Sequence, residues 1–412
     1  MTLTQKVLWA MLLGIIVGLM INLGGWNSEG SFVQEYVVGG LFYIIGKMFI
    51  TALKMLVVPL VFFSLISGVL GIGDVRKLGS VGVKSFALYM LTTAIAIATA
   101  ISLAIIVAPG SGANGTTETT FMGKEAPPLS EVLIHIIPDN VIHAFASGNM
   151  LQVIFFSILL GISLLMVGKK AQSIAEGVEV LNEAMMHMVN IIMSVAPLAV
   201  FALLAKAISE LGLDLLISLA GYVLVLVAAL LLHLFGTLMF ILKLFSGLSP
   251  KMFLQKIRDA QVFAFSTTSS NATIPVILRS VTKRMGVDNS VASFTVPFCA
   301  TINMDGTAIM QGVATVFIAN VYGVGLGLGG YLTVILMSVL ASIGTAGVPG
   351  VGLIMLSMVF VQVGLPVEGI GLILGVDRLL DMIRTSVNIT GDAVVTCVVA
   401  KSEKELEMSV FT

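Results

Sequence analysis

The sequence predicts an all-α membrane protein with eight transmembrane helices and two re-entrant helical hairpins. Of its 412 residues, 58% are hydrophobic and only 10% are charged, whereas soluble globular proteins carry roughly 25% charged residues. Apolar runs of the ~20 residues needed to cross a bilayer recur along the chain. This composition argues against a water-soluble enzyme. The near balance of 21 Lys and Arg against 22 Asp and Glu argues against a nucleic-acid partner.

The first six transmembrane helices are predicted by six long apolar runs. These runs are 7–23, 42–70, 86–108, 150–167, 185–207 and 215–244. With Lys6 before it, the first run resembles a secretory signal, but no small-residue cleavage site follows. We therefore interpret it as an uncleaved first membrane helix.

The distribution of Lys and Arg predicts the orientation, because short cytoplasmic loops collect these residues. With a cytoplasmic N-terminus, most of the 21 cationic residues lie inside, provided that 251–284 and 330–366 enter the membrane and return. The tips of these segments, 266–275 and 341–349, are rich in small and polar residues. Such backbone survives at membrane depth only when it is buried in protein or lines a wet cavity. We therefore predict two re-entrant hairpins and cytoplasmic N- and C-termini.

The C-terminal part has the pattern of an inverted repeat. Segments 251–322 and 330–401 are equal in length, and each is a hairpin followed by a helix. On the predicted topology they enter from opposite sides of the membrane. Two inverted repeats with broken segments in corresponding positions indicate a transporter binding site.

The last predicted helix carries a polar stripe. Asp381, Arg384, Asn388 and Asp392 follow one another at spacings of three, four and four residues, with Thr385 beside them. An ionised residue at the bilayer centre costs at least ~2.5–3.5 kcal/mol, so this face must meet protein or water. A structural Asp381–Arg384 salt bridge is the simpler alternative, but it leaves Asp392 without a partner.

A second polar cluster, 301–307, interrupts an apolar stretch. Asn303, Asp305 and Gly306 break a helix locally and expose carbonyl oxygens, which suits a hard cation. A helix kink with a capping Asp is the alternative. A third group, of hydroxyl side chains, lies on the predicted helix 86–108. Alone it would not indicate a site, because hydroxyls on a membrane helix usually bond to their own backbone. It consists of Tyr89, Thr92 and Thr93.

Four motifs together resemble the dicarboxylate/amino acid:cation symporter family, which includes the excitatory amino acid transporters and archaeal aspartate transporters. They are the Ser/Thr-rich first tip, 303–307, 341–350 and 381–392, and the resemblance runs from about residue 7 to 401. It implies an elevator-type transporter that assembles as a homotrimer in membrane lipid. Residues 1–245 would form mainly the scaffold and trimer contacts, with 86–108 contributing to the transport core.

The resemblance also divides the remainder of the chain. The transport core, 246–402, would consist of hairpin 1 (251–284), a broken seventh helix (285–322), hairpin 2 (330–366) and an eighth helix (368–401). A cytoplasmic tail, 403–412, would follow. The expected location is the plasma membrane, or the inner membrane of a Gram-negative cell.

The family pattern assigns Arg384 to the substrate side-chain carboxylate and Asp381 to its amino group. The guanidinium fork matches a carboxylate, so an acidic amino acid, L-aspartate or L-glutamate, suits the pair better than a plain dicarboxylate. The other implied substrate contacts are Ser269, Ser270, Thr307, Val348, Thr385 and Asn388. The implied sodium ligands are Tyr89, Thr92, Thr93, Thr301, Asn303, Asp305, Ser342, Ile343, Thr345, Asn388 and Asp392.

The charge of these residues predicts the coupling. Asp305, Asp381 and Asp392 with Arg384 leave two negative charges, and an acidic amino acid adds a third. A low-dielectric site cannot carry that charge cheaply, so we expect about three sodium ions per substrate and no other cofactor. Gln311 stands where proton-coupled animal relatives carry a glutamate, which favours sodium. A proton-coupled glutamate or C4-dicarboxylate symporter of the same fold is the alternative.

The chain departs from the family pattern at two positions. Thr268 and Met382 stand where archaeal and animal members, respectively, carry an arginine, and Arg378 is a candidate replacement as a partner for Asp381. Because of this difference, the family pattern does not predict the substrate affinity or the gating of this chain. The four histidines lie outside the motifs, and we interpret them as structural or interfacial. They are His135, His143, His187 and His233.

Two other classes of protein are weighed against a symporter. The stretch 71–74 resembles the Gly-x-Gly-Asp signature of intramembrane aspartyl proteases, but Asp74 stands beside Arg76 and Lys77 at a predicted membrane edge. Paired broken hairpins also resemble the pore loops of a cation channel, which would conduct with little requirement for a substrate. The polar stripe favours a carrier that is not an enzyme.

Overall fold

The computed structural model describes residues 3–28, 30–70, 79–111, 134, 136–342 and 350–411. Within these ranges the regular structure is helical, apart from one antiparallel bridge between Val287 and Leu406. Five helical segments of the described chain are long and apolar enough to cross a membrane. They are Gln5–Leu23, Val33–Leu70, Ser80–Val107, Gln152–Ser194 and Leu215–Ser246. The predicted all-α membrane protein is confirmed at this level.

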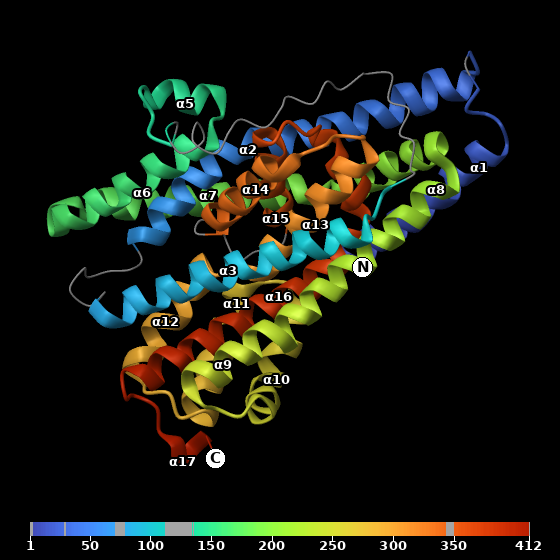
Figure 1. Cartoon of the computed structure of the whole chain (residues 1–412). Helices are drawn as coiled ribbons and strands as arrows, with labels where there is room; N and C mark the ends of the chain where they lie inside the picture. The colour runs from blue at the N-terminus through green and yellow to red at the C-terminus, as the bar shows by residue number, and fades with distance from the viewer. Residues whose placement is uncertain are drawn as a thin grey trace.

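The N-terminal part is built from long apolar helices packed side by side. α1 lies along α8, α2 packs against α6 and α7, and α3 runs beside α13 (Figure 1). The elements are α1 (Leu3–Leu23), η1 (Val33–Phe42), α2 (Tyr43–Leu70), α3 (Gly79–Val107), α5 (Val141–Ser147), α6 (Met150–Val167), η2 (Gly168–Ala171), α7 (Gln172–Ser194), α8 (Ala196–Leu232), η3 (His233–Leu238) and α9 (Met239–Ser246).

Helix boundaries differ from the predicted runs where polar residues continue a helix. The third helix begins at Gly79 rather than at residue 86, because hydropathy marks only the apolar part while backbone hydrogen bonds continue beyond it. The predicted run 185–207 is not one helix, because α7 ends within it at Ser194 and α8 begins at Ala196. α8 continues into the run 215–244, and its two halves meet at a kink. Gly212 makes this kink with φ +65°, a conformation that favours glycine.

The C-terminal part contains two pairs of short helices, and the first of them is α10 (Pro250–Thr267) with α11 (Ser270–Arg279). Thr268, with φ +52°, ends α10, and the Ser269 hydroxyl accepts a hydrogen bond from Ala272 N at the start of α11. The second pair is α14 (Gly327–Ser342) with α15 (Val351–Gln362). At ~1.5 Å per residue these two helices span about 24 and 18 Å, less than the ~30 Å of a hydrocarbon core.

Between and after these pairs lie the helices that carry the polar motifs. α12 (Asn289–Ile302) and α13 (Asp305–Val321) are separated by Asn303 and Met304, and neither has helical backbone angles. α16 (Ile370–Ser402) is largely buried and contacts α8, α10, α12 and α13 (Figure 1). The short elements η4 (Ser280–Arg284), η5 (Val367–Gly369) and α17 (Met408–Phe411) complete the described chain.

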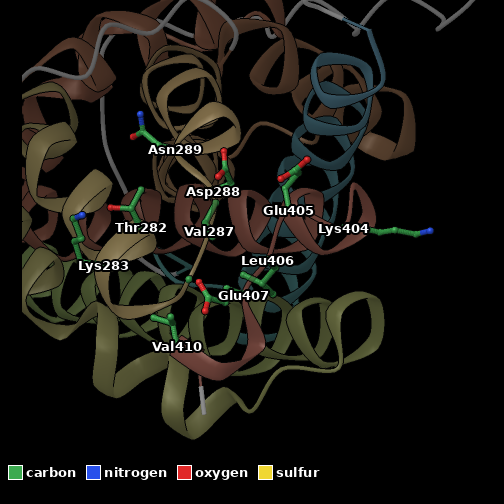
Figure 2. A pocket seen from close by; sticks show the side chains of 11 residues that line it. Thr282, Lys283, Val287, Asp288, Asn289, Lys404, Glu405, Leu406, Glu407 and Val410 are labelled. Carbon is green, nitrogen blue, oxygen red and sulfur yellow. The ribbon is translucent and has the colours of Figure 1, made fainter.

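The segment after α16 folds back onto the turn between η4 and α12. Asp288 N donates to Glu405 O at 2.9 Å, and Glu407 N donates to Gly286 O at 2.8 Å. Phe411 is only 2% exposed, and Lys256 Nζ donates to its carbonyl oxygen at 2.6 Å. Figure 2 shows the two segments around the cavity that they line. The volume of this cavity is about 380 Å³. This cavity shares no lining residue with the buried polar groups of α13 and α16.

Candidate substrate and cation site

Asp305 begins α13 directly after the break at Asn303 and Met304, and it is fully buried. One carboxylate oxygen, Oδ1, accepts hydrogen bonds from the hydroxyls of Thr93 at 2.6 Å and Thr92 at 3.4 Å. The other, Oδ2, lies 3.0 Å from His233 Nε2. Residues from α3, α13 and η3 therefore converge on one carboxylate.

A second carboxylate lies on α16 opposite the helix break. Asn303 Nδ2 donates to Asp392 Oδ1 at 3.0 Å. Among the described residues, Asp392 Oδ2 and Asn303 Oδ1 have no hydrogen-bond partner, although both side chains are buried. A buried acceptor without a donor is costly, whereas a hard cation binds such oxygens. The chemistry of these two oxygens therefore fits a hard cation.

Glycines allow α13 and α16 to approach closely here. Gly306 N donates to Asn388 Oδ1 at 2.7 Å, and a Cβ on Gly306 would lie 2.7 Å from Arg384 O. A Cβ on Gly391 would lie 2.8 Å from Asn303 Nδ2. Because these two positions have no side chain, the motif 303–307 can pack directly against the polar stripe on α16.

Arg384 is 1% exposed and lies between two carboxylates of its own helix. Its Nη2 donates to Asp381 Oδ1 at 2.9 Å. Its Nη1 is 2.8 Å from Asp377 Oδ1, close enough for an ion pair although not aligned as a hydrogen bond. Arg378 Nη1 lies 3.9 Å from Asp381 Oδ2. Charges of both signs therefore alternate along one face of α16, and both ends of the guanidinium fork face carboxylates.

The second helix pair reaches this face through α15. A Cβ on Gly352 would lie 3.2 Å from Thr307 Cγ2 and 3.8 Å from Arg384 Nη1. Thr385 lies beside the stripe, where its hydroxyl donates to the backbone oxygen of Asp381 at 2.7 Å. Thr307 and Thr385 are thus placed near Arg384 by α13 and α16.

The remaining predicted residues lie at helix ends or deeper in α3. Ser269 and Ser270 lie at the start of α11, which packs against α16. Thr301 belongs to the last turn of α12, and Ser342 ends α14 with its hydroxyl bonded to Val339 O. The fully buried Tyr89 directs its hydroxyl to Cys299 Sγ. Three predicted positions lie outside the described residues: Ile343, Thr345 and Val348.

Two residues of this polar region were not predicted from the sequence. Asp377 precedes Arg384 by seven residues, which places both on one helix face, so the spacing held a signal. His233 stands alone in an apolar run and carried no such signal, and its interpretation as structural or interfacial did not include the contact with Asp305. Within the described ranges, no three His, Cys, Asp or Glu side chains gather in a way that could hold a metal ion.

Comparison with known proteins identifies the family. The sequence profile of the sodium:dicarboxylate symporter family matches residues 3–402. The chain belongs to this family. It is therefore a membrane transporter and not an enzyme, as predicted, and the resemblance on which that prediction depended is confirmed.

Relatives within the sodium:dicarboxylate symporter family are named for different functions. The chain is 33% identical to a proton/sodium-glutamate symport protein of Bacillus caldotenax, over 96% of this chain and 94% of that one. It is 34% identical to a C4-dicarboxylate transport protein of Bacillus subtilis (strain 168), over 98% and 94%. It is 32% identical to a proton/glutamate-aspartate symporter of Escherichia coli (strain K12), over 98% and 94%. These identities do not separate the substrates or the coupling ions.

Proposed function

We propose that this symporter carries an acidic amino acid, L-aspartate or L-glutamate, into the cell together with sodium ions by alternating access. Two neighbouring features carry the proposal. One is the group of charges around Arg384 and Asp381. The other is the pair of side-chain oxygens, one of Asp392 and one of Asn303, that have no hydrogen-bond partner among the described residues. The first arrangement suits a zwitterion with an extra carboxylate. The second suits a cation.

The substrate assignment follows from complementary charge. Arg384 presents a planar fork that a substrate carboxylate can engage in place of Asp377. Asp381, one turn earlier, is available to the ammonium group, which a plain dicarboxylate lacks. We assign the remaining substrate contacts to the residues that the family pattern implies: Ser269, Ser270, Thr307, Val348, Thr385 and Asn388.

Charge balance supports sodium coupling. The polar region holds four carboxylates and two guanidiniums, all buried or half-buried, which leave two negative charges. They are Asp305, Asp377, Asp381 and Asp392 with Arg378 and Arg384. A bound acidic amino acid adds one more, so about three sodium ions restore neutrality. Each net positive charge moved inward gains ~2.3 kcal/mol per 100 mV of membrane potential.

The cation ligands in this proposal come from three places in the chain. Asp392, Asn388 and Asn303 form one group, and Asp305 with Tyr89, Thr92 and Thr93 forms another. The backbone carbonyls of Thr301, Ser342, Ile343 and Thr345 would complete the third.

The architecture of the proposal is a homotrimer in the plasma membrane with eight membrane helices and two re-entrant hairpins. The short lengths of α14 and α15 support re-entrance, because neither helix reaches across a hydrocarbon core. The sequence analysis places residues 1–245 mainly in the scaffold; because His233 contacts Asp305, we propose that the segment Leu215–Ser246 contributes to the transport core as well. Cytoplasmic termini follow from the distribution of Lys and Arg.

The proposal is tested by uptake into proteoliposomes that contain the purified protein. Radiolabelled L-aspartate, L-glutamate and succinate are offered separately under a sodium gradient, a proton gradient or neither, with the potential set by potassium and valinomycin. We expect sodium-driven uptake of an acidic amino acid that accelerates when the interior is negative. Uptake that carries no current would contradict the count of three sodium ions.

A proton-coupled glutamate or C4-dicarboxylate symporter is the second candidate, because relatives named for these functions are equally similar to the chain. It predicts uptake driven by a proton gradient in the absence of sodium. For the dicarboxylate, succinate would be transported and an amino acid would not compete.

A further inference from the structure

His233 is a buried ionisable side chain to which the proposed transport cycle gives no role. It is 1% exposed and lies inside the apolar segment Leu215–Ser246. An imidazole in such surroundings is unfavourable unless it has a partner. Its Nε2 lies 3.0 Å from Asp305 Oδ2. The partner is therefore a carboxylate that the proposed function assigns to a cation.

His233 stands where the backbone departs from the regular α-helix. η3, which begins at His233, is a π-helical turn within an otherwise α-helical run. Such turns are frequently found at functional sites. We assign the Nε2–H of the ring as the donor to Asp305, because the charge balance of the proposed function has Asp305 as a carboxylate, which only accepts hydrogen bonds.

Asp305 is thus held at both oxygens, but by groups with different abilities. Thr92 and Thr93 donate to Oδ1, and a hydroxyl can turn and offer its lone pairs to a cation. The N–H of His233 on Oδ2 cannot make this change. With a cation at Oδ1, the threonine hydroxyls would reorient while the ring would keep the carboxylate in place.

We propose that His233 is a positioning residue that fixes the Asp305 carboxylate for cation binding and so sets the affinity of this site for the coupling ion. The inference rests on the proposed function, since it requires that a cation binds at Asp305. Loss of one hydrogen bond to a buried charged group corresponds to roughly ten- to hundredfold in affinity. The affinity for the cation should therefore decrease, and the affinity for the amino acid should change much less.

The test compares three variants in proteoliposomes. His233→Leu removes the donor, whereas His233→Gln keeps an N–H at a similar reach. His187→Leu makes the same chemical change at an exposed position on α7. Two quantities are measured, namely the sodium concentration for half-maximal uptake at saturating substrate, and the KM for substrate at saturating sodium.

We expect His233→Leu to raise the half-saturating sodium concentration roughly ten- to hundredfold while the KM changes much less. His233→Gln should recover most of the sodium affinity, and His187→Leu should behave as wild type. A general loss of folding would lower the amount of active protein. It would not change the half-saturating sodium concentration relative to the KM for substrate. Stabilisation of each purified variant by NaCl, measured against choline chloride as a rise in melting temperature, provides a second reading without transport.

The outcomes separate this inference from the proposed function. If the wild type shows neither sodium-driven uptake nor stabilisation by sodium, the coupling ion is wrong and the role of His233 is refuted with it. If the wild type responds to sodium and His233→Leu responds with the same half-saturation, only the role of His233 is refuted. Equal sodium affinities of the Leu and Gln variants would also refute it, because the N–H would then make no difference.

Discussion

Replacement of Gly306 by Ala should force α13 away from α16 and weaken transport. The added Cβ would lie 2.7 Å from Arg384 O, whereas an ordinary contact begins at 3.4 Å, so the helices must separate by about 0.7 Å. The obstacle is backbone and cannot rotate away. The same displacement stretches the hydrogen bond from Gly306 N to Asn388 Oδ1, now 2.7 Å, beyond its normal range.

The magnitude follows from three contributions. Overpacking costs about 1–3 kcal/mol, and the lost hydrogen bond costs about 0.5–1.5 kcal/mol. The better helix propensity of alanine returns up to about 1 kcal/mol. We therefore expect a net destabilisation of roughly 2 kcal/mol, seen as a fall of a few degrees in the melting temperature. Uptake should fall as well, because the displacement separates Asn388 from the motif 303–307.

The assay is thermal unfolding of the purified protein together with uptake at saturating sodium. Gly177→Ala is the matched control, because Gly177 is exposed on α7 and no described atom lies within 4 Å of its added Cβ. It should be neutral or slightly stabilising, the opposite sign to Gly306→Ala. Wild-type melting and wild-type uptake for Gly306→Ala would refute the close approach of α13 and α16.

Three further outcomes follow from the site and the tail. Arg384→Ala should abolish uptake of acidic substrates, and retained aspartate binding by calorimetry would contradict its role. Asp392→Asn should raise the half-saturating sodium concentration more than it changes selectivity between aspartate and neutral amino acids, and competition uptake distinguishes the two effects. Hydrogen bonds from Lys84 and then Ser80 hold the pKa of Glu403 below its ordinary value. The stabilisation of the tail by Glu403 is thus present above the unfolded pKa and is lost as the pH falls through the lower folded value. Hydrogen exchange at 403–411 should rise in that acidic range in the wild type and much less in Glu403→Gln.

The sequence was most informative where periodicity alone sets the geometry. The spacing of Asp381, Arg384, Asn388 and Asp392 predicted one face of one helix, and the four residues lie on α16 together. Asp377 obeyed the same rule, two turns before Arg384, and its spacing was available without the structure. A helix face follows from the fixed rotation per residue, so it requires no knowledge of tertiary packing.

Contacts between helices were harder to predict from the residues themselves. The convergence of Thr93 with Asp305 and of Asn303 with Asp392 was anticipated only through the family resemblance. The contact of His233 with Asp305 joins positions 72 residues apart. No periodicity links such positions, because their distance depends on how α8, α3 and α13 pack. Helix ends were displaced for a related reason, since hydropathy reports the membrane and not the hydrogen-bonded backbone.

The docked C-terminal segment has a practical consequence for following the molecule in motion. Phe411 is inserted in the protein, and Lys256 of α10 binds the carbonyl oxygens of Val410 and Phe411. A fluorophore or reporter joined just beyond this point would start from an anchored base and not from a loose end. Its signal would therefore report on the position of α10 and α16, with little contribution from motion of the linkage itself.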